Sequence, residues 1–201
     1  MDEVLAGVLH WSRRHPNTGW HAHSYYVADR RLLIDPMVPE EGLDAIAEHG
    51  EPERVVLTVR HHLRDAREFV SRFGCDIVAH EAGLHEFADG PVVTGFAFGD
   101  EIAPGVTAHE LGAITPEDTV LHVHAGTHAL HFADGLINHD GRIRFMPDNL
   151  MDDPPTVKAR TFERLRALLE LDFDTLLFAH GGPIGPGGGR DALARLAEQS
   201  A

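Results

Sequence analysis

One short stretch of the sequence concentrates side chains that could do chemistry. Residues 57–66, LTVRHHLRDA, contain Arg60, His61, His62, Arg64 and Asp65. Histidine can ligate a metal ion or exchange a proton near neutral pH, and carboxylates serve both purposes. Arginine stays charged and instead pairs with carboxylates or binds anions. The stretch therefore indicates a metal site, an anion site, or a former metal site that now binds an anion.

The residues on either side predict where this stretch lies in the fold. Val55–Leu57 is an apolar run typical of a buried strand, and Ala66, Phe69, Val70 and Phe73 follow the i, i+3, i+4, i+7 spacing of one helix face. Sites in α/β proteins lie at the carboxyl ends of strands, where loops aim side chains into a crevice. We expect the functional site at the end of this strand.

The rest of the chain alternates between strand and helix patterns. Strands are predicted over 4–12, 21–35 (interrupted by the turn 28–31), 55–58, 77–79, 106–109, 119–123, 129–132, 136–137, 143–145 and 175–179. Helices are predicted over 43–47, 66–73, 81–87 and 156–171, and from about residue 191, while 89–105 is predicted to be an irregular crossover rich in Gly and Pro. Each half runs from strands to a closing strand–helix unit, which favours two stacked sheets with helices outside.

Composition narrows the function classes. The 201 residues are 43% hydrophobic, which suits one domain spanning residues 1–201 with a sizeable core. A net charge of −15 argues against nucleic acid or an anionic membrane as partners. No apolar run is long enough to span a bilayer, and the acidic start Met1-Asp2-Glu3 lacks the pattern of a secretory signal. With Cys75 as the single cysteine, a cytoplasmic protein acting on a small molecule is expected.

Four landmarks, in this order, resemble the metallo-β-lactamase superfamily over essentially the whole chain. They are Leu33-Ile34-Asp35, the loop after Leu57-Thr58, Ala133-Asp134-Gly135-Leu136, and Ala179-His180-Gly181. The resemblance implies an α/β (α+β) fold, the four-layer αββα sandwich of the metallo-β-lactamase type. It also implies that Asp134 and His180 stand where relatives bind metal.

The metal loop departs from the family pattern, Thr-His-x-His-x-Asp-His. With one residue inserted at Val59, the four ligand positions fall on Arg60, His62, Arg64 and Asp65, so only His62 is retained. A later family histidine is replaced by Ala113. This resembles a divergent branch whose metal loop contains arginines.

The surviving ligands support two interpretations. In the first, His62, Asp134 and His180, with Asp65 or His61 as further ligands, hold one divalent ion (Zn, Fe or Mn) in a hydrolase-like enzyme, with Asp134 or Asp65 as catalytic base. In the alternative, no metal is bound, and Arg60 and Arg64 replace the cations and bind a small anionic ligand. In the absence of a metal ion, we expect one of these arginines to pair with Asp65 or Asp134. A mononuclear iron oxygenase is disfavoured because two family histidines are missing.

Further histidines and a glycine-rich run could indicate other binding sites. His122, His124, His128 and His131 could form a second metal site, but solvent-facing histidines are the favoured interpretation. His109 lies shortly before Ala113 and could reach the crevice. The glycine-rich run 181–189 lacks the Gly-Lys-Ser/Thr ending of a phosphate-binding loop and is predicted to be a close-packed connection.

Overall fold

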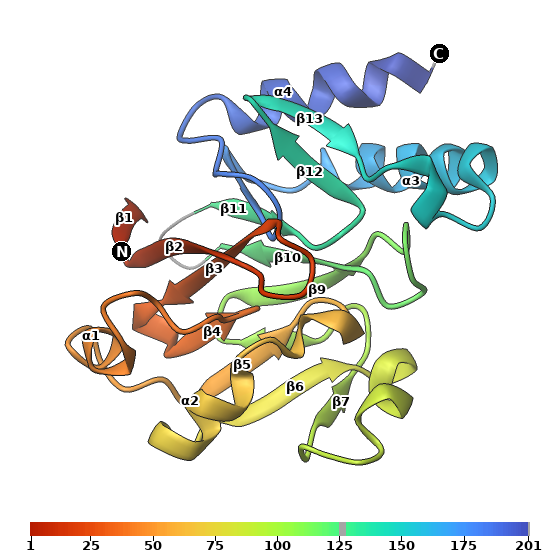
Figure 1. The fold of residues 1–201 in the computed structure, drawn as a ribbon. Coiled ribbons are helices and arrows are strands. Elements are labelled where there is room, and N and C mark those ends of the chain that lie inside the picture. Colours follow the sequence, from red (N-terminus) through yellow and green to blue (C-terminus); the bar gives the residue numbers. More distant parts are fainter. Residues whose placement is uncertain (125–127, 201) are drawn as a thin grey trace.

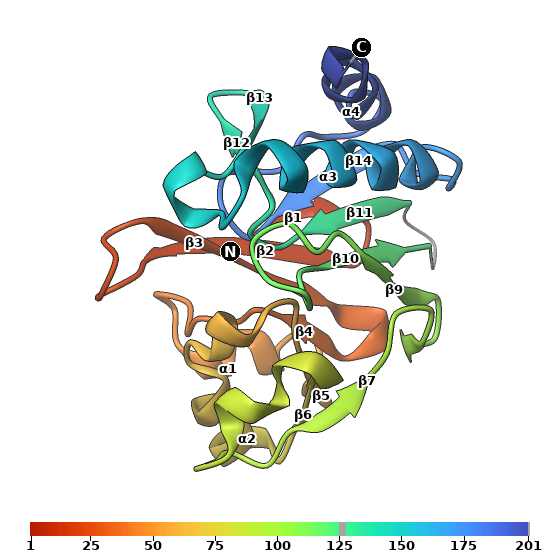
Figure 2. The same ribbon diagram turned by 90° about the vertical axis from the view of Figure 1, so that its right-hand side faces the viewer.

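Two sheets stack face to face and carry helices on their outer sides, as Figure 1 and the orthogonal view in Figure 2 show. The computed structural model describes residues 1–124 and 128–200. In Figure 2 the layers follow one another from α3 and α4 at the top, through the two sheets, to α1 and α2 at the bottom.

The first sheet has seven strands in sequential order. They are β1 (Asp2–Leu5), β2 (Val8–Arg14), β3 (His21–Val27), β4 (Leu32–Ile34), β5 (Arg54–Leu57), β6 (Asp76–His80) and β7 (Thr94–Phe96). β1 to β4 are antiparallel, whereas β4 to β7 are parallel. The crossovers between the parallel strands contain α1 (Leu43–Ala47), α2 (Ala66–Phe73) and the 3₁₀ segment η3 (Glu81–Phe87). The carboxyl ends of these parallel strands therefore lie at the same end of the sheet.

The second sheet has five strands in the order β14–β11–β10–β9–β8. Their bounds are β8 (Glu101–Ala103), β9 (Val106–Glu110), β10 (Thr119–Val123), β11 (Ala129–Phe132) and β14 (Thr175–Phe178). β12 (Leu136–His139) and β13 (Arg142–Phe145) form a separate hairpin, followed by α3 (Pro154–Leu168) and, after β14, α4 (Gly189–Ala197). β11 and β14 are parallel, so their carboxyl ends also lie together.

Three apolar layers separate these elements. Tyr25, Ile34 and Leu177 belong to the layer between the sheets. A second layer joins the first sheet to α1 and α2, and a third joins the second sheet to α3 and α4. Each sheet thus buries both of its faces, and the predicted αββα sandwich of the metallo-β-lactamase type is confirmed.

Two stretches differ from the sequence prediction. The strand expected over 4–12 is divided into β1 and β2, because Gly7 adopts a left-handed turn with φ of +74°. The segment 89–105, expected to be irregular, contains β7 and β8. Each of these strands has three residues and lies at a sheet edge, so neither carries the long alternation that marks a strand in a sequence.

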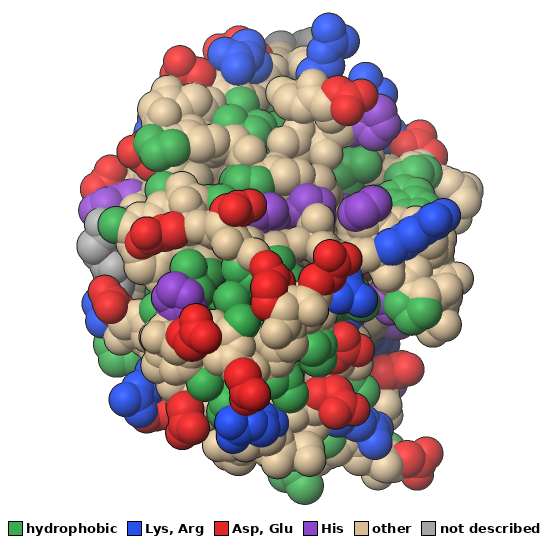
Figure 3. All heavy atoms as spheres, turned by 60° about the vertical axis from the view of Figure 1, so that its left-hand side comes forward, with side chains coloured by type: hydrophobic (Ala, Val, Ile, Leu, Met, Phe, Trp, Pro, Cys, Tyr) green, Lys and Arg blue, Asp and Glu red, His purple; other side chains and the backbone are tan. Residues whose placement is uncertain are grey.

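The surface carries both signs of charge. On the face shown in Figure 3, acidic and basic side chains are interspersed, and histidines gather in a band across the middle. Among the described residues, no helix has the length and apolar character that crossing a membrane requires.

Candidate metal centre

Loops after four strands bring polar side chains to one crevice. Asp35 follows β4, His62 lies in the 3₁₀ turn η2 (Arg60–Leu63) after β5, Asp134 follows β11, and His180 follows β14. β5 and β14 belong to different sheets, yet the ring centroids of His62 and His180 lie 5.6 Å apart. The prediction that these two strand ends converge on one crevice is confirmed.

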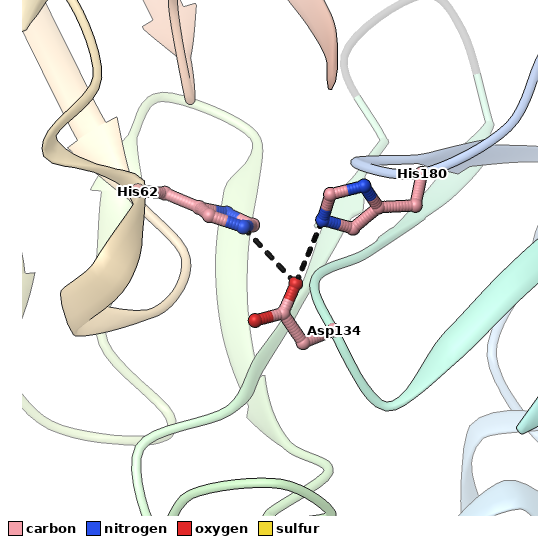
Figure 4. Close-up of side chains that lie close together, drawn as sticks. All are labelled: His62, Asp134 and His180. Carbon is pink, nitrogen blue, oxygen red and sulfur yellow. Dashed lines mark ion pairs between the residues drawn. The ribbon is translucent and has the colours of Figure 1, made fainter. Parts of the chain in front are cut away.

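Three of these side chains form a group that could hold a metal ion. The Nε2 atoms of His62 and His180 lie 3.0 and 3.1 Å from Oδ1 of Asp134, and all three point toward one another in Figure 4. One ligand atom from each residue lies within 4.8 Å of the others. Within the described part of the chain, no other group of histidine, cysteine, aspartate and glutamate meets this criterion.

Asp35 determines how His62 is presented. Its carboxylate is fully buried, accepts hydrogen bonds from the backbone N–H and the hydroxyl of Thr58, and accepts one from Nδ1 of His62 at 2.9 Å. Because Nδ1 donates to Asp35, Nε2 is directed at Asp134. A histidine ligand supported by a carboxylate in this way is typical of metal sites.

The ionisable side chains of the group strongly affect one another's pKa. Burial and the Arg64 cation lower the pKa of His62, but the carboxylates of Asp134 and Asp35 outweigh them and raise it to about 9. Burial raises the pKa of Asp134, yet the nearby His62 and His180 hold it well below its usual range. Without a metal ion, His62 is therefore a cation at neutral pH and neutralises one carboxylate.

Closely packed residues lie beneath Asp134 and form the floor of the site. A side chain on Gly135 would place its Cβ 2.7 Å from both the Ala113 Cβ and the Asp118 Oδ2, so only glycine fits there. Asp118 is fully buried, and burial, reinforced by the charge of Asp134, raises its pKa to about 7. Ala113 is buried in this floor and has no ligand atom, as the replaced family histidine suggested.

Arg64 lines the crevice but does not pair with a site carboxylate. Its Nη1 donates to the carbonyls of Asp35 at 2.6 Å and His23 at 2.8 Å, and its Nη2 lies 3.5 Å from the carbonyl of Ala179. The residue has a φ of +40°, which strains a non-glycine backbone. The guanidinium thereby ties the ends of β3, β4 and β14 together, across both sheets.

Arg60 is oriented toward a different partner. It forms a two-pronged ion pair with Glu117, and the side chains of the two residues are only 16% and 2% exposed. The expectation that Arg60 or Arg64 pairs with Asp65 or Asp134 is therefore wrong. Glu117 lies 57 residues from Arg60, so no local pattern indicated this partner.

The two further candidate ligands lie outside the three-residue group. Asp65 accepts a hydrogen bond from the backbone N–H of Val38 at 2.8 Å and so fastens the metal loop to the segment after β4. His61 is exposed and lines the crevice beside His62. Neither residue contributes an atom to the group in the present geometry.

A pocket of about 360 Å³ opens above the group. Its apolar wall consists of Trp20, Ala22, Met146 and Leu150. His15 and Thr18 line it from the tip of the β2–β3 hairpin, and Trp20 contacts the His180 ring edge-on, with a centroid separation of 6.0 Å. The pocket is within the size range of small-molecule sites and combines apolar walls with a few polar groups.

The remaining histidines have other environments. His109, His122 and His124 form a row on the second sheet, with ring centroids 6.1 and 4.9 Å apart, and Nε2 of His122 donates to the carbonyl of Asp172. His131 faces the layer between the sheets, where it contacts Tyr25 edge-on. In the glycine-rich run, a Cβ on Gly181 would lie 1.9 Å from the Asn138 carbonyl oxygen, which fits the predicted close-packed connection.

Sequence reasoning missed Asp35 and Asp118 as parts of the site. Asp35 belongs to the first of the four sequence landmarks but was given no role, although a carboxylate directly after the apolar run Leu32–Ile34 was a usable signal. Asp118 precedes a strand and is brought beneath Asp134 by tertiary packing alone.

The fold has close counterparts among solved structures. An archaeal metallo-β-lactamase superfamily protein from Sulfolobus tokodaii matches with a TM-score of 0.70 at 14% identity, over 96% of this chain and 85% of that one. A motif mutant of a metallo-β-lactamase from Cronobacter sakazakii matches with 0.65 at 15% identity, over 99% and 92%. A mutant flavo di-iron protein from Thermotoga maritima matches with 0.63 at 16%, over 96% and 59%.

These similarities show the metallo-β-lactamase fold, as the sequence resemblance implied. No protein-family model matches the sequence, and no curated protein matches it.

Proposed function

We propose that this protein is a hydrolase that acts on a small molecule with one divalent metal ion held by His62, Asp134 and His180. The observation that carries the proposal is the convergence of two imidazole nitrogens and one carboxylate oxygen at the base of an apolar pocket. Two histidines and a carboxylate are a sufficient protein ligand set for zinc or iron with one position left open.

The chemistry of the donor set fits a cation. Oδ1 of Asp134 is buried and lies 3.0 and 3.1 Å from the Nε2 atoms of His62 and His180, so the three ligand atoms converge on one point. Asp35 already holds the proton of His62 on Nδ1, which leaves Nε2 as the ligand atom.

The surrounding residues would position a substrate and keep its environment dry. A divalent ion at this place would supply Lewis acidity and an acidified water at its open position. Asp35 orients His62, Arg64 binds three backbone carbonyls around the crevice, and Trp20, Met146 and Leu150 would shield a bound molecule from solvent. Asp134 belongs to the three-residue group, whereas Asp65 lies outside it and accepts a hydrogen bond from the Val38 N–H, so Asp134 is the favoured base.

The alternative is a metal-free protein that binds a small anion, and one observation favours it. Protonated His62 and Arg64 already balance the charges of Asp35 and Asp134. A dication would have to displace the His62 proton and would lie near a guanidinium, which is unfavourable at short range.

Elemental analysis of the purified protein, followed by titration with Zn²⁺, Fe²⁺ and Mn²⁺, decides between the two. We expect one equivalent per chain, retained through dialysis, and its loss in His180→Ala and Asp134→Asn. His139→Ala is the matched control, because His139 is exposed and lies outside the group. Two retained equivalents would contradict the proposal, and binding of none of these ions would favour the alternative.

A further inference from the structure

The tip of the β2–β3 hairpin is held rigidly over the candidate metal group. The N–H of His15 donates to the carbonyl of Trp20 at 2.7 Å, and the N–H of Gly19 donates to the carbonyl of His15 at 2.8 Å. Nε of Arg14 adds a bond to the carbonyl of Gly19 at 3.0 Å. These bonds close the turn and place His15, Thr18 and Trp20 in the pocket wall.

Two side chains of this tip have their acceptor atoms engaged within the turn. Nδ1 of His15 accepts a hydrogen bond from the N–H of Asn17 at 3.3 Å, and Oγ1 of Thr18 accepts one from the N–H of Trp20 at 3.3 Å. A neutral imidazole whose Nδ1 is an acceptor carries its proton on Nε2. Burial lowers the pKa of His15, and Arg64 and His62 lower it further, which keeps the ring neutral near pH 7.

Several polar groups of the pocket are already engaged. Arg64 donates to backbone carbonyls, the Nε2 atoms of His62 and His180 face Asp134, and His61 lines the pocket with its side chain exposed. On the hairpin side, His15 carries an Nε2–H donor and Thr18 a hydroxyl donor, and both residues line the pocket.

We propose that His15 and Thr18 form an oxyanion-binding subsite that makes the pocket specific for acyl compounds such as carboxylic esters. This inference rests on the proposed hydrolase function. As the oxygen of water bonds to the acyl carbon, the carbonyl electron pair moves onto the acyl oxygen, where the two donors stabilise the negative charge. When the C=O bond re-forms, the bond to the alkoxy group breaks, and the departing alcohol carries away the proton that the water lost.

Preorganised donors of this kind act on the transition state more than on the bound substrate. A neutral imidazole N–H can fill this role, as established for triosephosphate isomerase. The apolar residues Trp20, Met146 and Leu150 would receive the organic part of the ester.

The kinetic test uses 4-nitrophenyl phenylacetate with the metal-loaded protein. His15→Leu and Thr18→Val remove one donor each, and we expect each to lower kcat by about 10²-fold with KM changed less than threefold. His15→Gln keeps an N–H donor and should recover part of kcat. His21→Ala is the control, since His21 is exposed at the start of β3 and does not line the pocket. Losses that appear mainly in KM, or an equal loss in the control, would overturn the subsite.

A binding test separates this inference from the hydrolase proposal. Calorimetry with 4-nitrobenzylphosphonate, a tetrahedral anion, should show binding weakened at least tenfold in His15→Leu and Thr18→Val, but not in His21→Ala. If the wild-type protein hydrolyses no ester while this pattern holds, the subsite stands and the hydrolase proposal falls. Equal phosphonate affinity in all four proteins would overturn the subsite, whatever the activity.

Discussion

Asp35 supports the three-residue group without belonging to it. It lies in a left-handed conformation with φ of +47°, and its carboxylate holds both Thr58 and the Nδ1–H of His62. Burial raises its pKa, but His62 and Arg64 keep the carboxyl ionised. The strained backbone and the buried charge of Asp35 therefore both serve to orient the ring of His62.

Asp35→Asn is predicted to weaken metal binding by about 10- to 100-fold, because an amide supports the required His62 tautomer poorly. Competition with a chromophoric chelator would measure the dissociation constant. Asp140→Asn serves as the control, since the Asp140 side chain is 91% exposed. Unchanged affinity in Asp35→Asn would mean that the ring of His62 is oriented by its packing alone.

At the scale of elements, two arginines of the stretch 57–66 form bonds that join separate parts of the fold. Arg64 joins the ends of β3, β4 and β14 through backbone carbonyls. Arg60 joins the η2 turn to the segment before β10 through Glu117. Two guanidinium groups thus hold this loop in place.

The Arg60–Glu117 pair gives this view a quantitative test. Arg60→Met should lower the free energy of unfolding by roughly 3 kcal/mol, because Glu117 would remain a buried carboxylate without its partner. Adding Glu117→Gln should recover part of the loss, with a coupling of about 1–3 kcal/mol in a double-mutant cycle of urea unfolding. Additive losses would mean that the two residues contribute independently, through packing.

At the scale of the whole molecule, the layer between the two sheets contains buried polar groups as well as apolar ones. His131 is fully buried there, and neither of its ring nitrogens has a hydrogen-bond partner among the described residues. Burial is the main cause that lowers the pKa of His131 to about 4. The folded state thus requires this ring to be neutral.

His131 should make the sandwich sensitive to acid. Between pH 6.5 and about 4, His131 takes up a proton in the unfolded chain but not in the folded protein. The contribution of His131 to the free energy of unfolding is therefore greatest above pH 6.5 and falls as the pH drops. His131→Leu should reduce this acid-induced loss by roughly 3 kcal/mol. Urea unfolding of the wild type, His131→Leu and the exposed-site control His139→Gln at several pH values measures the effect. The same pH dependence in all three would contradict it.

The sequence by itself determined the layers of the fold and the three residues of the central group. Apolar runs such as Val55–Leu57 and the helical spacing of Ala66 to Phe73 reflect burial of a strand or of one helix face. Such burial can be predicted from the order of apolar and polar residues alone. His62, Asp134 and His180 could be predicted because each follows a recognisable strand within a motif of known order.

Only the tertiary structure decided how the charges are partnered. Arg60 meets Glu117, Arg64 meets three backbone carbonyls, and Asp118 lies beneath Asp134, all through contacts between segments far apart in the chain. Whether a guanidinium faces a crevice or turns away depends on the conformation of one 3₁₀ turn and on a strained residue at its end. Residue order carries no direct record of these directions, because a loop has no repeating period from which the facing of a side chain can be inferred.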